Sequence, residues 1–218
     1  MVQSEKKVIE IFSTTTHSMV FILQDKLDIW AEWLQFDGQS KSKKWDMHNP
    51  PQMLLQSYEQ NQKNVDGKMR IVPDIGNFNP GDIILSKMAA ERLENFWLRF
   101  GELLPLDVEG VTYFYYNVTN VIENAVDFEK SIKGRRGQLR RPAFIADAIP
   151  DDLQIFKIPE QRFASLYVSG HGFTKLIQEQ GLKLGVYIFP VWSPSTGVVP
   201  QPSLFEDYSA PPTDDMVK

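Results

Sequence analysis

The sequence predicts an α+β protein in which helices pack on a mixed or antiparallel sheet. Stretches rich in apolar residues and typical of strands alternate with stretches whose apolar residues recur at helical spacing. One pattern occurs twice: an apolar strand, a serine, an amphipathic helix, a glycine and a further strand. Because 42% of the 218 residues are hydrophobic, the chain can also bury a sizeable core.

The first 72 residues predict an N-terminal region of strands and a helix packed on the main domain. Residues 8–12 and 19–23 have the composition of strands, and a Ser/Thr-rich turn joins them. Large apolar residues at 27, 30, 33 and 34 predict a short helix. The polar run 39–44 predicts a mobile loop, and residues 53–62 predict a further helix.

The first copy of the repeated pattern begins at residue 83 and predicts a strand, a helix to residue 100 and a second strand over 103–106. Apolar residues lie on one face of this helix at i, i+4, i+7, i+8 and i+11, beginning at Ala89. Ser86 is placed to cap the first turn by accepting a backbone N–H, which is worth about 1 kcal/mol. Gly101 is expected to end the helix in the left-handed conformation.

The second copy predicts a strand over 166–169, a helix to residue 180 and a strand over 184–191. Its helical face is weaker, and Gly181 stands where Gly101 stands in the first copy. An old duplication and a chance recurrence of a common local arrangement both explain the likeness.

The rest of the main domain, residues 73–192, reads as strands and connections. Residues 111–121 are the strongest strand candidate because they are rich in Tyr, Phe and Val. Residues 124–131 predict a helical turn, while residues 153–158 and 163–168 predict strands. After residue 192 the chain becomes rich in Pro and Ser and then acidic, so residues 193–218 are expected to form a frayed or partner-dependent tail.

Composition excludes several classes of function. The chain has no cysteine, which excludes disulfides, thiolate metal sites and a cysteine nucleophile. Its 23 basic and 28 acidic side chains leave a net charge of −5, so general binding to nucleic acid is not expected. We expect no signal peptide, no membrane partner and a cytoplasmic location, since no apolar stretch approaches the roughly 20 residues of a membrane span.

Catalytic motifs are not found in the sequence. The three histidines are far apart and form no metal-binding pair, and neither a Walker motif nor a nucleophile elbow occurs. Ser169, Gly170, His171 and Gly172 join a strand to a helix, a context that can bind phosphate, but Lys175 replaces the third glycine of the dinucleotide pattern. A tight structural turn is the favoured interpretation, so we expect no catalytic residue, metal or cofactor.

The strongest charge feature is a basic, glycine-containing run that is expected to form an exposed loop. Arginine forks bind carboxylates and phosphates well, so the run is the candidate partner-binding site, for an acidic partner or for nucleic acid. A solvated loop without function is the alternative. The residues are Lys133, Arg135, Arg136, Arg140 and Arg141.

Several segments of residues 73–192 together form a recognisable pattern. They are Pro73-Asp74, Ile84-Leu85-Ser86, Gly101 to Pro105, Tyr113 to Val118, Asn120-Val121-Ile122, Ala125-Val126-Asp127, Ile155-Phe156-Lys157, Val168-Ser169, Gly181-Leu182 and Gly185 to Val191. In the order and spacing of these segments the chain resembles immunity family eleven of the bacterial polymorphic-toxin systems, formerly a domain of unknown function.

The resemblance implies an antidote that binds and neutralises a cognate bacterial toxin and has no enzymatic activity of its own. The net charge of −5 would suit a basic toxin. Two other functions stay open: a small enzyme with a site near His171, and a nucleic-acid-binding module that uses residues 133–141. Tryptophans 30, 33 and 45 could also serve a homodimer.

Overall fold

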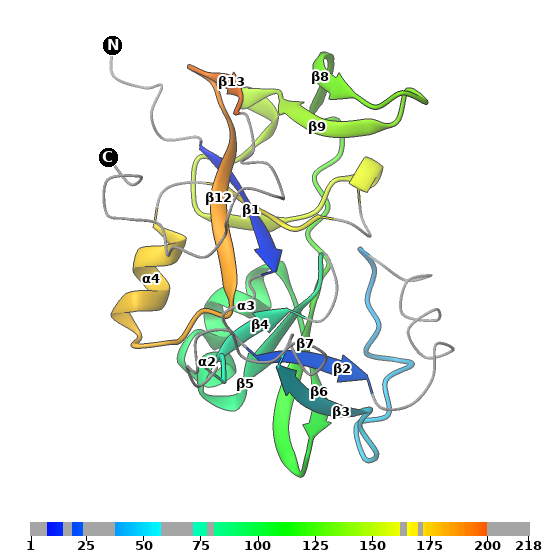
Figure 1. Ribbon diagram of the computed structural model, residues 1–218, viewed down its shortest axis with the longest axis vertical. Helices are drawn as coiled ribbons and strands as arrows, with labels where there is room; N and C mark the ends of the chain where they lie inside the picture. Colours follow the sequence, from blue (N-terminus) through cyan, green and yellow to red (C-terminus); the bar gives the residue numbers. More distant parts are fainter. Residues whose placement is uncertain are drawn as a thin grey trace.

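The computed structural model describes residues 8–14, 19–23, 38–57, 72–77, 81–161, 165–169 and 172–199. It has mixed and antiparallel sheets with a few short helices, which confirms the α+β prediction (Figure 1). The short helix predicted around residues 27–34 lies outside the described residues, as do residues 200–218 of the tail predicted over 193–218.

The larger sheet has six strands in the order β2-β3-β6-β7-β5-β4. The parallel pairing of β3 with β6 makes the sheet mixed, and its other pairings are antiparallel. Its strands are β2 (Met19–Leu23), β3 (Gln52–Ser57), β4 (Ile75–Asn77), β5 (Ile83–Ser86), β6 (Gly101–Val108) and β7 (Val111–Val118).

The second sheet has five strands in the order β10-β11-β1-β12-β13, all antiparallel to their neighbours. The N-terminal strand lies in its centre, so the first and last parts of the chain are paired with each other. Its strands are β1 (Ile9–Thr14), β10 (Gln154–Phe156), β11 (Tyr167–Ser169), β12 (Val186–Ser193) and β13 (Gly197–Val198).

The two predicted N-terminal strands therefore exist but belong to different sheets. Strand β1 pairs with β11 and β12, whereas β2 pairs with β3 and joins the larger sheet. The helix predicted over residues 53–62 is wrong in its described part, because residues 52–57 form β3 beside β6. Pairing with an available sheet edge prevails there over a weak local helical pattern.

The predicted helix over residues 87–100 is present but divided into α2 (Lys87–Arg92) and α3 (Glu94–Phe100). The backbone leaves helical geometry at Leu93, where φ is −123° and ψ is 26°. The Ser86 hydroxyl accepts the Ala89 N–H at 3.1 Å, so the predicted cap is confirmed. Across the break, the Trp97 indole N–H donates to the Ala89 carbonyl at 2.9 Å.

Gly101 does not end the helix in the left-handed conformation, and that expectation is wrong. Its backbone is extended, with φ −173°, and it is the first residue of β6. A side chain is excluded there for another reason. A Cβ atom would lie 2.3 Å from the carbonyl oxygen of Asn117 on the neighbouring strand, so only glycine allows this close approach.

The two segments predicted as repeated units differ in local chemistry. In the first, β5 and β6 lie on either side of β7; in the second, β11 and β12 lie on either side of β1. Gly172 precedes α4 (Phe173–Glu179), which has no side-chain cap, so Ser169 does not repeat the role of Ser86. Gly181 adopts a φ of +64° after the helix, whereas Gly101 is extended.

Asp74 links the segment that contains Ser86 to the segment that contains Lys183. Its carboxylate accepts the Ser86 hydroxyl at 2.8 Å and the Lys183 backbone N–H at 2.8 Å. Its own N–H donates to the Lys183 carbonyl, and Ile75 forms a parallel bridge with Leu184. Helices α2, α3 and α4 share one buried core with both sheets; among its members are Trp97, Tyr116, Ile155, Val168 and Phe173.

Candidate functional site

A two-stranded hairpin of β8 (Val126–Lys133) and β9 (Leu139–Phe144) lies at one end of the long axis of the molecule (Figure 1). We call residues 126–144 the basic hairpin. Its base is firmly attached to the protein, because the Phe144 ring contacts those of Phe156, Tyr167 and Trp192 at centroid distances of 5.3 to 6.0 Å. The base therefore fixes the direction of the hairpin.

Strand β8 replaces the predicted helical turn over residues 124–131, which is wrong as a description of the segment. The pairing with β9 shifts between Asp127 and Ile132, and Asp127 caps the resulting bulge. Its carboxylate accepts the N–H groups of Glu129 and Lys130 at 3.1 Å. The ammonium of Lys130, 2.9 Å away, also holds the pKa of Asp127 below its usual range. Side-chain capping thus stabilises an extra stretch of chain within a strand.

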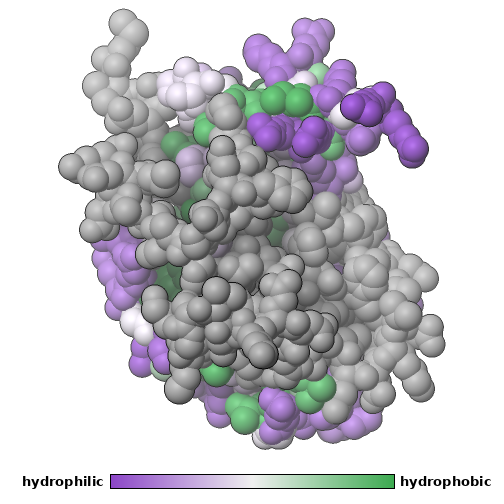
Figure 2. All heavy atoms as spheres, viewed as in Figure 1, coloured by the Kyte–Doolittle hydropathy of each residue, from purple (hydrophilic) through white to green (hydrophobic). Residues whose placement is uncertain are grey.

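The bulge and the adjacent strand leave large apolar side chains in solvent. Phe128 is 48% exposed, Ile132 is 43% exposed and Ile145, just beyond β9, is 44% exposed. Figure 2 shows hydrophobic atoms at this end of the molecule with hydrophilic side chains on either side. Exposed aromatic and aliphatic groups among cations are typical of a surface that binds another protein.

The tip of the hairpin is an ordered loop. The Gly134 N–H donates to the Gln138 carbonyl at 2.8 Å, and the Gly137 N–H donates to the Gly134 carbonyl at 3.0 Å. Gly137 has a φ of +78°, a conformation that favours glycine. The side chain of Gln138 folds back across the loop and accepts the Arg136 N–H at 3.0 Å. The backbone from which the arginines project is therefore held in place.

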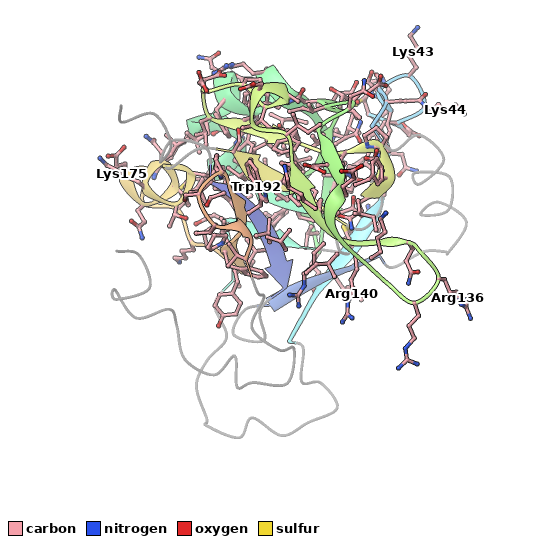
Figure 3. All side chains as sticks on the ribbon, turned by 90° about the horizontal axis from the view of Figure 1, so that it is seen from above. Lys43, Lys44, Arg136, Arg140, Lys175 and Trp192 are labelled. Carbon is pink, nitrogen blue, oxygen red and sulfur yellow. The ribbon has the colours of Figure 1, made fainter. Side chains whose placement is uncertain are left out.

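The predicted basic loop is in part a strand. Only residues 134–138 form the loop, while Lys133 ends β8 and Arg140 and Arg141 belong to β9. Arg141 is half-buried and the other four cations are exposed. Figure 3 shows Arg136 and Arg140 extending away from the ribbon, and Lys43 and Lys44 projecting from a separate corner.

These five cations have no carboxylate partner within the described part of the chain. The ion pairs found there join other residues: they include pairs on α2 and α4, the pair of Arg99 with Asp152 and, within the hairpin itself, the pair of Lys130 with Asp127. The positive charge that the described residues leave unneutralised is available to an anionic partner. The structure thus places the five predicted residues on one hairpin, together with apolar side chains that the sequence analysis did not select.

The second sequence candidate is only partly described. Ser169 is buried at the end of β11, and its hydroxyl lies 3.4 Å from the Asp152 carbonyl oxygen. Gly170 and His171 lie outside the described residues, so an enzyme site near His171 stays a prediction. Of the other histidines, His17 also lies outside them, while His48 is exposed.

A polar cluster that sequence reasoning missed lies against β6 and β7. Lys41, predicted to lie in a mobile loop, is only 3% exposed. Its ammonium donates to Asn117 Oδ1 at 2.7 Å and lies 3.4 Å from the Tyr115 hydroxyl, which donates to Asp82 at 2.7 Å. A run of Ser and Lys residues carries no sequence signal that one lysine will be buried.

Glu102 completes this Lys41 cluster. Burial opposes its ionisation, but hydrogen bonds from the Ser40 hydroxyl, the Lys41 N–H and the Asn117 amide hold the pKa of Glu102 below its usual range. Trp45 stacks on Tyr115 with ring centroids 5.6 Å apart. An ammonium, a phenol and two carboxylates are capable of acid–base chemistry, but the bonds described here hold the segment around residues 39–45 against the sheet.

The described residues contain no group of three or more His, Asp or Glu side chains arranged to hold a metal ion. None of the helices in that part of the chain combines the length and apolar composition that crossing a membrane requires.

No model of a known protein family matches the sequence, and no curated protein matches it. The chemistry of the basic hairpin and the sequence resemblance are therefore the two observations that bear on function.

Proposed function

We propose that this protein is a cytoplasmic antidote that binds and neutralises a cognate bacterial toxin and carries out no reaction of its own. The observation that carries the proposal is the basic hairpin. The hairpin carries five cations without carboxylate partners in the described residues, four of them exposed and Arg141 half-buried, and Phe128 and Ile132 are exposed on the same hairpin. The resemblance to immunity family eleven supplies the toxin as the class of partner.

The hairpin has the features that make a protein surface bind tightly. Arginine and aromatic side chains are the residues that most often dominate binding energy at interfaces. The tip is preorganised by Gln138, so less conformational entropy is lost when the partner docks. Its base is anchored by Phe144, which belongs to a buried core cluster.

The net charge of the chain and the local charge of the hairpin together indicate which charges the toxin would carry. The whole chain has a net charge of −5, which suits a basic toxin at long range. At contact distance the local charge decides, because screening limits long-range terms to about 10 Å. The toxin surface that receives the hairpin would therefore carry carboxylates together with an apolar recess for Phe128.

The decisive experiment isolates the toxin and then reverses the hairpin charge. The tagged protein is purified from its native cells, and a stoichiometric co-purifying chain is tested for toxicity in cells that lack the antidote. Arg135→Glu with Arg136→Glu should then weaken toxin binding by roughly 30-fold or more, the effect of losing an arginine hot spot. Protection of the cells should fall in parallel.

A matched control uses Lys87→Glu with Lys175→Glu, which changes the net charge equally on exposed helical positions. It should leave toxin affinity within about threefold. Equal loss of affinity in both double variants would contradict a role for the hairpin. Absence of any toxic partner would contradict the antidote function itself.

Nucleic-acid binding is the second candidate, and the hairpin cations, which have no carboxylate partner among the described residues, favour it. Against it, Asp127 and Glu129 lie in the same hairpin and would repel phosphates. Phe128 is the only aromatic residue within the hairpin strands available for stacking on a base in solvent. Salt-dependent retention of the protein on immobilised duplex or single-stranded DNA, lost in the Arg135→Glu, Arg136→Glu variant, would favour this candidate over the toxin.

A further inference from the structure

We propose that Arg141 and Ile132 form the anchor of the basic hairpin, where a protein partner docks a carboxylate and an aliphatic side chain carried on one face of a single segment. The inference rests on the proposed function for the identity of that partner, the toxin. It deepens the function by separating this anchor from the exposed cations at the tip of the hairpin.

The strand register places Ile132 and Arg141 on the same face of the hairpin. The two residues stand directly opposite each other, and opposed residues of an antiparallel pair project their side chains together, with Cβ atoms about 5 Å apart. The next pair, Lys133 with Leu139, projects from the other face because side chains alternate along a strand. One aliphatic side chain and one guanidinium are therefore side by side.

Regular pairing is interrupted on the base side of this pair. Between the pair of Asp127 with Ala143 and the pair at the anchor, residues 128–131 of β8 stand opposite Pro142 alone. Proline has no N–H to donate across the strands. The hydroxyl of Ser131 instead accepts the Ala143 N–H at 2.9 Å, which ends the bulge just before the anchor.

A second irregularity lies on the tip side of the pair. Arg140 is an extra residue of β9, because the register passes from Arg141 to Leu139 over two consecutive residues of β8. A bulge of this kind sets two residues of one strand against one residue of the other, so a second guanidinium originates directly beside the pair. Figure 3 shows the side chain of Arg140 extending away from the ribbon.

Arg141 differs from the other hairpin cations in its burial. It is half-buried, whereas the other four are exposed. No hydrogen bond or ion pair within the described part of the chain engages its guanidinium. Attraction between charges strengthens where water is partly excluded, so a carboxylate gains more from a half-buried guanidinium than from an exposed one. The planar fork can also donate two parallel hydrogen bonds to one carboxylate.

Ile132 supplies the apolar half of the anchor. Its side chain is 43% exposed, and contact with an aliphatic group would remove that apolar surface from water. The partner must therefore present an acidic and an aliphatic side chain on one face. Residues i and i+2 of an extended segment are about 7 Å apart, and residues i and i+4 of a helix are about 5 to 6 Å apart, so both kinds of segment meet this requirement.

The anchor and the tip would act at different stages of binding. Exposed cations attract an acidic surface before contact and so act mainly on the association rate. Paired hydrogen bonds and apolar contact form only in the docked complex and act on the dissociation rate. The anchor would therefore select among acidic partners that the tip attracts equally.

The test uses the full chain and three end-blocked tripeptides, and it contains no toxin. The first probe is glutamate–alanine–leucine; the second replaces glutamate by glutamine, and the third replaces leucine by serine. NMR titration follows the backbone amides of Ile132 and Arg141 and the Arg141 Nε–H. The first probe should give saturable shifts with a Kd on the order of 1 to 10 mM. The second should bind at least about fivefold more weakly and the third at least about threefold more weakly.

Conservative variants separate geometry from charge. Arg141→Lys keeps the charge but cannot form the paired hydrogen bonds, so it should weaken the first probe at least about fivefold. Arg136→Lys at the tip is the matched control and should stay within about twofold of wild type. Ile132→Ser should remove the preference for leucine over serine in the probe, whereas Val111→Ser, an exposed aliphatic position in the other hairpin, should preserve it.

Equal weakening by Arg141→Lys and Arg136→Lys would overturn the proposal. So would equal binding of the leucine and serine probes to wild-type protein, a comparison that stands even if a variant fails to fold. Failure of the anchor in these titrations would leave the antidote function intact. Absence of a toxic partner from the native cells would contradict the antidote function and leave the anchor intact.

Discussion

Two antiparallel hairpins, β6–β7 and β8–β9, lie at opposite ends of the long axis, and they differ in what covers them (Figure 1). The β6–β7 hairpin pairs without interruption from Gly101 with Val118 to Val108 with Val111. Its two-residue turn has positive φ at Glu109 and Gly110, which matches the twist of the strands. The basic hairpin instead has a shifted register and a five-residue loop.

Coverage explains the difference. Helices α2 and α3 pack on one face of β6–β7, and Trp45 with the Lys41 cluster packs on the other. The basic hairpin is buried only at its base and leaves Phe128, Ile132 and its cations in solvent. A hairpin covered on both faces contributes stability, whereas one anchored at its base retains a surface for recognition. Matched substitutions in the two hairpins test this contrast.

The largest effect on stability is expected from Gly101→Ala. The added Cβ would meet the Asn117 carbonyl oxygen at 2.3 Å, and backbone in the middle of a sheet cannot move away. The free energy of unfolding should fall by about 3 kcal/mol or more. Gly134→Ala is the matched change in the basic hairpin, where the Cβ meets only the flexible Gln138 side chain. It should cost less than about 1 kcal/mol. Urea unfolding of both variants measures the contrast, and equal losses would contradict it.

A smaller effect is expected from Lys41→Met, which keeps the length of the side chain but removes its charge. Asn117 Oδ1 would lose a buried donor 2.7 Å away, a cost of about 2 kcal/mol. Lys133→Met in the basic hairpin removes an exposed lysine and should change stability by less than about 0.5 kcal/mol. If thermal or urea unfolding gave similar values for the two variants, the proposed structural role of the Lys41 cluster would be wrong.

The smallest effect is expected from Glu102→Gln, and it should depend on pH. The folded-state pKa of Glu102 lies below its usual value of 4.5, so the ionised carboxylate stabilises the fold above that value. This contribution is lost as pH falls through the lower, folded-state pKa. At pH 7 the free energy of unfolding of Glu102→Gln should be lower than that of wild type by less than about 1 kcal/mol, because solvent screens a partly exposed carboxylate. This difference should diminish below pH about 4.5.

Glu129→Gln in the basic hairpin is the control for this pH series and should change stability by less than about 0.5 kcal/mol at pH 7. Urea unfolding between pH 7 and pH 3 makes the comparison. If the loss of stability in Glu102→Gln grew as the solution became more acidic, the pH dependence would be opposite to the one expected.

Prediction from sequence succeeded where local chemistry decides the structure. The helical periodicity after Ser86 and the Ser86 cap itself depend on neighbours within four residues, and both are present. Prediction failed where the local conformation is determined by pairing with a strand that is distant in the sequence. Gly101 is explained by Asn117 on the adjacent strand, and residues 52–57 are extended because they pair with β2 and β6. The break at Leu93 was also not predicted.

The candidate surface shows the same division. The basic run was visible in the sequence because charge is a local property of the chain. That this segment forms strands was not visible in the sequence, because the Asp127 cap and the pairing with β9 replace a predicted helical turn. The exposure of Phe128 was not predicted either, because an aromatic residue between Asp127 and Glu129 carries no local signal that decides whether it is buried. The sequence had likewise assigned Lys41 to solvent.

By itself, then, the sequence determined the α+β class, the helix after Ser86, most of the strand predicted over residues 111–121, which ends at Val118, and the existence of a basic segment. These follow from periodicity, capping and composition within short windows of chain. Only the tertiary structure decided that the N-terminal strand lies between β11 and β12, that Lys41 is buried and that Phe128 is exposed. Strand pairing and burial depend on surfaces contributed by residues far apart in the sequence, and no local pattern specifies which surfaces meet.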